Sequence, residues 1–229
     1  MATVDARKLA AAEAAAELVE NGMVVGLGSG STATLAVAAI GRRTAGGLRI
    51  VGIPTSEKTA EQARTLGIPL TTLAVNPSID LTIDGADEVE RGSLNLVKGL
   101  GGALLREKIV ATASKRLVIV ADEDKIVTRI GEGFRPIPVE VAPFGWESTA
   151  GRLAGLGAEA TLRMTAEGKP FVSDGGHYIL DCRFREPEPA RVLQEKLDAT
   201  VGVMEHGLFL GMAGEAIVGQ TGGGVVRMK

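Results

Sequence analysis

Cysteine, histidine and aromatic residues are scarce in this chain of 229 residues. Aromatic residues make up 3%, and Cys182 is the only cysteine. A single cysteine excludes an internal disulfide and a cysteine-based metal site, and it is typical of a reducing compartment. We expect Cys182 to be a small core residue. The two histidines, His177 and His206, are too few and too poorly spaced for a zinc site, and we assign neither a catalytic role.

An excess of positive charge and long apolar runs are also absent. The net charge is −3, whereas nucleic-acid binding needs a basic surface and, for single strands, aromatic platforms. No nucleic-acid partner is therefore expected. No apolar run approaches the ~20 residues of a membrane helix, and the first residues show no basic segment followed by an apolar signal core. We expect a soluble, cytoplasmic protein without a membrane contact.

The first half of the chain instead alternates between helical and strand patterns. The predicted helices cover residues 4–20, 31–40, 56–66 and 103–111, and the predicted strands cover residues 23–27, 48–53, 70–73, 81–83, 94–97 and 117–121. Such βαβ alternation predicts a parallel sheet. The fold class is therefore α/β, with a Rossmann-like parallel sheet flanked by helices.

The pattern changes after residue 133, where short strands, prolines and a hairpin signal at Ser173–Gly176 follow one another. We predict a smaller inserted α+β domain of ferredoxin-like type over residues 134–206. The Rossmann-like catalytic domain then comprises residues 1–133 and 207–229. Residues 207–210 and 215–219 are expected to return as strands to the first sheet.

A glycine-rich loop, Gly26–Ala33, follows the first strand and opens a helix, which is a favourable place for an anion. Neither frame of this loop completes Gly-x-Gly-x-x-Gly, and no acid follows Ile53, where a dinucleotide site needs one. A P-loop is excluded because no lysine precedes Ser31-Thr32. The hydroxyls here fit a small phosphorylated ligand, and a tight turn with a capping serine stays open as the alternative.

A second polar cluster comprises Asp84–Glu88, Lys98–Gly102 and Arg106–Lys108. Asp84 and Asp87 have three interpretations, namely turn residues, metal ligands or contacts to a polar substrate. The calcium-loop series is missing, so a metal is unsupported. Glu107 alone would be a solvated helix residue, but its place in a first turn after Lys98 and several glycines favours another role. A carboxylate screened from water has a raised pKa, which suits a general base.

These motifs, in this order and spacing, closely resemble the ribose-5-phosphate isomerase family of the A type, and the resemblance runs along the whole chain. It implies an aldose–ketose isomerase that interconverts D-ribose 5-phosphate and D-ribulose 5-phosphate in the non-oxidative branch of the pentose phosphate pathway. It also implies that Glu107 is the general base of an enediolate mechanism without cofactor or metal. Asp84, Asp87 and Lys98 are then the remaining catalytic residues, acting on the sugar oxygens.

The resemblance further implies a substrate-binding set, with Lys8 and Ser29–Thr32 on the phosphate. The set is Lys8, Ser29, Gly30, Ser31, Thr32, Gly85, Ala86, Gly99, Leu100, Gly101 and Lys125. Leu100 departs from the glycine that many relatives have there, which puts in doubt that every N–H of its loop faces the substrate. The small domain is expected to act as a lid and as the contact of a homodimer or homotetramer.

Two other classes are weighed against this interpretation. An amino-sugar phosphate deaminase needs a catalytic histidine, and a coenzyme A transferase needs a nucleophilic glutamate in its own context; neither is evident. A non-catalytic sugar-phosphate sensor usually carries a DNA-binding helix-turn-helix, for which we find no segment. Trp146 and Tyr178 are interpreted as core or domain-interface residues.

Overall fold

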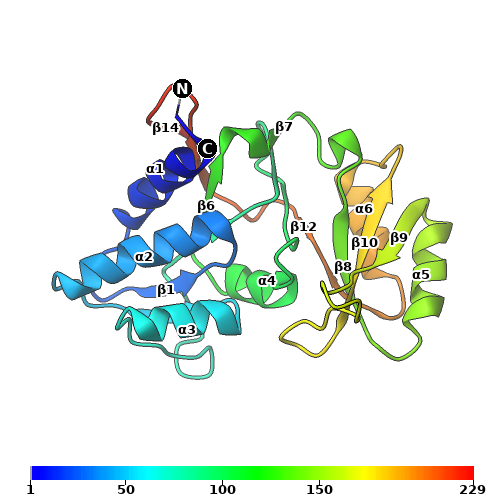
Figure 1. Ribbon diagram of the computed structural model, residues 1–229, viewed down its shortest axis with the longest axis horizontal. Coiled ribbons are helices and arrows are strands. Elements are labelled where there is room, and N and C mark those ends of the chain that lie inside the picture. Colours follow the sequence, from blue (N-terminus) through cyan, green and yellow to red (C-terminus); the bar gives the residue numbers. More distant parts are fainter. Residues whose placement is uncertain (1) are drawn as a thin grey trace.

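The protein forms two lobes in a computed structural model that describes residues 2–229 (Figure 1). Both termini lie on the larger lobe, beside α1 and β14. The α-helices are α1 (Val4–Ala16), α2 (Ser31–Ala45), α3 (Glu57–Thr65), α4 (Leu104–Thr112), α5 (Trp146–Gly155) and α6 (Ala190–Asp198), with short 3-10 turns at Glu123–Lys125 and Glu132–Phe134. No helix in the described part of the chain has the length and apolar character to cross a membrane.

The strands fall into three sheets. They are β1 (Val24–Leu27), β2 (Val51–Pro54), β3 (Leu81–Gly85), β4 (Glu88–Glu90), β5 (Leu96–Val97), β6 (Leu117–Asp122), β7 (Ile126–Val127), β8 (Ile137–Val141), β9 (Ala158–Leu162), β10 (Tyr178–Phe184), β11 (Val203–His206), β12 (Leu208–Phe209), β13 (Glu215–Gly219) and β14 (Val225–Met228).

The main sheet has the order β14-β13-β6-β3-β1-β2 and is parallel except for the edge strand β14. The expected Rossmann-like sheet is therefore confirmed. Leu27 at the end of β1 lies opposite Pro54 and Ile83, so the carboxyl ends of three strands meet at one edge. Because β1 has β2 on one side and β3 on the other, this edge contains a switch point, where ligands of α/β sheets collect.

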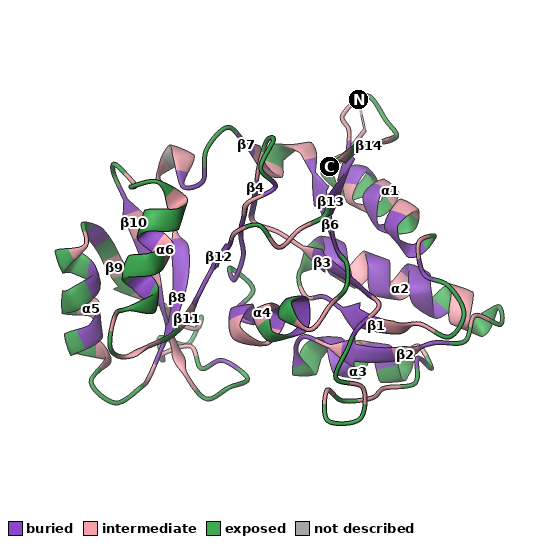
Figure 2. Ribbon diagram, turned by 180° about the vertical axis from the view of Figure 1, so that it is seen from behind, coloured by how far each residue is buried: buried purple, intermediate pink, exposed green. Residues whose placement is uncertain are grey.

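Alternating side chains of the sheet fill two cores. Val118 and Val120 of β6 pack with α1 and α2 on one face, whereas Ile119 and Ala121 pack with Phe209 on the other. The buried face of α1 consists largely of alanines, which lets it lie close to α2. Figure 2 shows the strands of the larger lobe as mostly buried.

The smaller lobe has the chain order β8-α5-β9-β10-α6-β11 and an antiparallel sheet of order β11-β8-β10-β9. This is the expected ferredoxin-like arrangement, and its strands lie within residues 134–206. The predicted hairpin turn is closed by the Ser173 N–H, which donates to the His177 carbonyl at 2.8 Å. Cys182 is fully buried in this lobe, as expected, and burial raises the pKa of its thiol to about 12.

Two strand predictions are wrong. Residues 70–73 form no strand: Leu70 makes a single bridge to Gly52, and the Thr72 carbonyl accepts two N–H groups of a turn. Residues 207–210 do not return to the first sheet. Instead β12 pairs with β5 in a third sheet of order β12-β5-β4-β7, and β13 takes the place beside β6. The first helix is also shorter than predicted and ends at Ala16.

Candidate active site

The loop after β1 presents an uncapped helix end at the switch point. Gly30, with φ 98°, precedes α2, and no side chain caps the helix. The N–H groups of the first turn are therefore free for an anion, as the helix dipole favours. Ser31 and Thr32 in this turn line a pocket, and phosphate binding by this loop stays a prediction.

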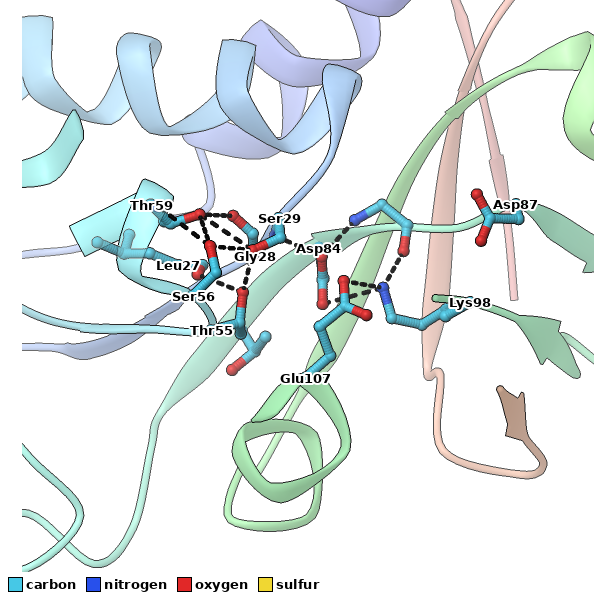
Figure 3. Close-up of polar contacts among 12 residues, drawn as sticks. Leu27, Gly28, Ser29, Thr55, Ser56, Thr59, Asp84, Asp87, Lys98 and Glu107 are labelled. Carbon is cyan, nitrogen blue, oxygen red and sulfur yellow. Dashed lines mark hydrogen bonds and ion pairs between the residues drawn. The ribbon is translucent and has the colours of Figure 1, made fainter. Parts of the chain in front are cut away.

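A cluster of four hydroxyl groups supports this loop (Figure 3). The Ser29 Oγ lies 2.8 Å from Thr55 Oγ1, 2.8 Å from Ser56 Oγ and 3.1 Å from Thr59 Oγ1. The Thr59 hydroxyl in turn donates to the Gly28 carbonyl at 3.1 Å. Sequence reasoning missed these three partners of Ser29. The Thr-Ser-x-x-Thr series directly after a strand was the signal, because neighbouring parallel strands end at the same edge.

Asp84 lies at the end of β3 and is 1% exposed. Its Oδ1 accepts the Ser29 N–H at 3.0 Å and the Gly85 N–H at 2.7 Å. A Cβ on Gly28 would lie 2.3 Å from the same oxygen, so only glycine permits this approach of the two loops. Asp84 thus joins the anion loop to the rest of the site.

Lys98 reaches the site from the third sheet, where its N–H donates to the Gly207 carbonyl at 2.9 Å. Its Nζ lies 3.0 Å from Asp84 Oδ2 and 3.1 Å from Glu107 Oε1. The ammonium also donates to the Gly85 carbonyl. Burial by itself would lower the pKa of Lys98, but the two carboxylates outweigh burial and raise it above the usual value. Lys98 is therefore a permanent buried cation.

Glu107 lies in the first turn of α4 and is 5% exposed. Burial outweighs the lowering by Lys98 and, together with the charge of Asp84, raises the pKa of its carboxyl to about 8. Its Oε2 has no partner among the described residues. Glu107 is therefore not the solvated helix residue that its helical position alone suggested, but a carboxyl screened from water.

Asp84, Glu107 and Lys98 together provide two buried carboxyls and one buried ammonium. Because two buried negative charges exceed the one positive charge, binding of one further proton is favoured. Burial raises the pKa of Asp84 as well. Asp84, however, accepts two backbone N–H groups and faces Lys98, whereas Glu107 has Lys98 as its one donor. These contacts favour Glu107 as the carboxyl that holds this proton, and a pKa raised to about 8 suits it to lose and regain the proton near neutral pH.

The structure brings most of the predicted site residues to one pocket. Those that line it are Ser29, Gly30, Ser31, Thr32, Gly85, Ala86, Asp87, Lys98, Gly99, Gly101, Glu107 and Lys125. Asp84 does not line the pocket itself but pairs with Lys98, which does. Leu100 is 46% exposed, and its N–H donates to Asp87 Oδ2 at 2.9 Å. Lys8 does not line the pocket, and its contact with phosphate stays a prediction.

The described residues contain one group of carboxylates and imidazole close enough to hold a metal ion, namely Asp198, Glu205 and His206. None of them lines the pocket. The Lys108 ammonium bonds both Glu205 and the His206 carbonyl, and a fixed cation there opposes a second one. Neither histidine lines the pocket, which disfavours the deaminase alternative.

The sequence of the chain was compared with protein families and with known proteins. Residues 51–223 match the family described as ribose 5-phosphate isomerase A (phosphoriboisomerase A). The chain belongs to the ribose 5-phosphate isomerase A family. It is 58% identical over 219 residues to ribose-5-phosphate isomerase A of Synechococcus sp. (strain JA-3-3Ab), with 95% of each chain covered. The protein of that name from Gloeobacter violaceus is 57% identical, over 96% of this chain and 95% of the relative.

Solved structures agree with the family assignment. Ribose 5-phosphate isomerase A of Methanocaldococcus jannaschii superposes with a TM-score of 0.93 at 38% identity, covering 99% of this chain and 100% of the other. A D-ribose-5-phosphate isomerase in complex with phospho-erythronic acid has a TM-score of 0.95 at 34% identity, with both chains covered fully. These members of the ribose 5-phosphate isomerase A family share both lobes with this chain.

Proposed function

We propose that this chain interconverts D-ribose 5-phosphate and D-ribulose 5-phosphate by moving one proton between neighbouring carbons. The observation that carries the proposal is the buried Glu107–Lys98–Asp84 group in a pocket whose other side is the uncapped start of α2. An acid–base group, a fixed cation and an anion site are what isomerisation of a sugar phosphate needs. The family membership supports the same reaction.

In this reaction Glu107, once ionised, removes the proton from C2 of the open-chain aldose. The C2–H electrons form the C1–C2 double bond, and the carbonyl electrons move to O1, which gives an enediolate. Glu107 then returns the proton to C1, and O2 becomes the ketone oxygen as its proton moves to O1. No electron leaves the substrate, so no redox cofactor is required.

In this scheme Lys98 and Asp87 act on the oxygen atoms of the sugar. The Lys98 ammonium is the cation nearest Glu107 and stabilises negative charge on O1 or O2. The Asp87 carboxylate lines the pocket and accepts a proton from a sugar hydroxyl during ring opening and the transfer between O1 and O2. Asp84 holds Lys98 and the Ser29 N–H in place. Lys125 lines the same pocket and contributes a second cation for the phosphate.

A coupled assay with three sugars tests this function. Ribose 5-phosphate should be turned over, arabinose 5-phosphate should bind but turn over poorly, and unphosphorylated ribose should show a strongly reduced kcat/KM. The physical reason is that the phosphate at α2 orients C2 towards Glu107, and lost orientation costs several kcal/mol. Binding of ribose 5-phosphate without any turnover would contradict the isomerase and favour the sensor.

We also propose that the enzyme acts in the cytoplasm as a homodimer or homotetramer, with the small lobe as lid and as contact. Phe144 is 98% exposed and Val201 is 75% exposed on this lobe, near one another because the Ala142 N–H donates to the Gly202 carbonyl. Two neighbouring exposed apolar side chains support a contact on this lobe, as parts of a patch that a second chain covers. Light scattering of the purified protein should give a mass of two or four chains, and a monomer would contradict the assembly. Cell fractionation followed by the isomerase assay checks the location.

A further inference from the structure

An arginine of the small lobe contacts the glycine loop of the catalytic pocket. Arg163 follows β9, and its side chain is 14% exposed. Its Nε donates to Asp181 Oδ2 at 3.0 Å, and its Nη2 donates to the other oxygen of that carboxylate. Its Nη1 donates to the Gly99 carbonyl at 2.9 Å and to the Leu100 carbonyl at 3.1 Å. One guanidinium thus fixes two consecutive peptide groups from outside the larger lobe.

The direction of these two carbonyls determines where the following N–H groups point. In a trans peptide the C=O and the N–H point in opposite directions. Because Arg163 holds both carbonyls, the N–H groups of Leu100 and Gly101 point away from Arg163. The Leu100 N–H meets Asp87 Oδ2 at 2.9 Å. Gly101 lines the pocket, and its N–H has no acceptor within the described residues.

The loop itself supplies one turn bond, in which the Gly102 N–H donates to the Gly99 carbonyl at 3.0 Å, and the contacts with the small lobe add to this bond. Gly99 has φ 107° and Gly102 has φ 82°, conformations that glycine adopts freely but does not hold. The aromatic ring of Phe171 packs on Gly102, where a Cβ would lie 2.4 Å from the ring. Arg163 lies over the same ring, with its guanidinium carbon 5.9 Å from the centroid. Arg163 and Phe171 therefore clamp the loop from one side.

We propose that Arg163, held by Asp181, is a positioning residue for the isomerisation. It orients the Gly99–Gly102 loop so that the Leu100 N–H holds Asp87 and the Gly101 N–H donates to a substrate oxygen as negative charge develops. The inference rests on the proposed function. The same arrangement explains why leucine is tolerated at position 100. Its side chain is exposed, and its backbone N–H still donates to Asp87.

Three variants test this role, namely Arg163→Met, Asp181→Asn and the control Arg185→Met. Arg185 pairs with Glu159 on the same lobe but is 78% exposed and lies outside the pocket lining. We expect Arg163→Met to lower kcat by roughly 10- to 100-fold, the effect of a displaced catalytic group. KM for ribose 5-phosphate should change much less, because the phosphate site at α2 is untouched. Asp181→Asn should shift kcat in the same direction by less, and Arg185→Met should match the wild type.

A binding measurement distinguishes a specific effect of Arg163 on the Gly99–Gly102 loop from a general loosening of the whole pocket. Titration calorimetry with phospho-erythronic acid, whose carboxylate resembles the charged end of the enediolate, should show an affinity about tenfold lower in Arg163→Met. Inorganic phosphate should bind as in the wild type. A kcat within twofold of the wild type in a folded Arg163→Met variant would overturn the proposal, and so would an equal loss for both ligands.

Two further measurements keep the test decisive. If Arg163→Met does not fold, Arg163→Lys takes its place, because one ammonium cannot hold Asp181 by two bonds and both carbonyls at once. The same selective loss is then expected, and wild-type behaviour of that variant would overturn the proposal. Failure of the wild type to isomerise ribose 5-phosphate would refute the proposed function instead.

Discussion

A Glu107→Gln variant should lose roughly 10²–10⁴-fold in kcat while it still binds ribose 5-phosphate, because a positioned acid–base group contributes about that much. The amide keeps an acceptor for Lys98, which lies 3.1 Å from Glu107 Oε1, but it cannot take a proton from carbon. The substitution also leaves one buried carboxylate for one buried ammonium. We therefore expect unfolding stability to be unchanged or higher, so that the loss of rate is not a loss of fold. Steady-state kinetics and urea unfolding measure the two quantities.

The pH dependence of kcat/KM, compared between the wild type and Glu107→Gln, identifies the group that titrates. Because burial raises the pKa of Glu107 to about 8, the ionised base becomes about tenfold more abundant for each unit by which the pH rises towards that value. The wild-type kcat/KM should therefore rise from about pH 6.5, which lies above the second pKa of ~6 of a phosphate monoester. It should level off above about pH 8. In Glu107→Gln this rise should be missing.

A matched control is Glu57→Gln, which makes the same chemical change at an exposed carboxylate near the start of α3. Glu57 is 65% exposed and pairs with Arg106. We expect its rate and its pH profile to follow the wild type. A Glu107→Gln enzyme that isomerises at the wild-type rate would refute the assignment of Glu107 as the base.

The fold was predictable from the sequence where elements are long or strongly patterned. β6 (Leu117–Asp122) contains a continuous apolar run over residues 117–121, and such a run marks a strand buried on both faces. The third sheet was missed because its strands are two or three residues long and its pairs, such as Leu208 with Val97, are far apart in sequence. Local pattern indicated strands at residues 94–97 and 207–210, but it does not identify which distant strand such a short strand pairs with.

Sequence motifs predicted those parts of the candidate site in which the type of residue alone indicates its chemical role. The Asp84, Lys98 and Glu107 motifs indicated an acid–base site before any coordinates. The proton shared by the two carboxyls beside Lys98 depends on burial, which the local sequence around these three residues does not report. Arg163 was missed for a different reason, since it lies in the other lobe and acts through the carbonyls of Gly99 and Leu100. Backbone contacts of this kind leave no pattern in the sequence.

Replacing Lys98 by methionine should have the largest combined effect on activity and stability. The ammonium is 2% exposed and faces two buried carboxyls. Its removal takes away the cation that stabilises the enediolate oxygen, a loss of about 10²–10³-fold in kcat. At about pH 9, where both carboxyls are ionised in the wild type, the substitution also leaves two buried carboxylates without a counter-charge, which costs roughly 3–5 kcal/mol of unfolding free energy. Enzyme assays and urea unfolding measure both effects.

The double variant Lys98→Met/Glu107→Gln decides whether that instability arises from carboxylate repulsion. With Glu107 neutral, one carboxylate remains, on Asp84, and it keeps its bonds from the Ser29 and Gly85 N–H groups. Part of the lost stability should therefore return, although the enzyme stays inactive. Lys115→Met is the matched control, because that lysine is 65% exposed and pairs with Asp80; its loss should stay within about 1 kcal/mol. If the double variant is no more stable than Lys98→Met, the ammonium stabilises the fold through packing and its bond to the Gly85 carbonyl rather than by balancing two carboxyl groups.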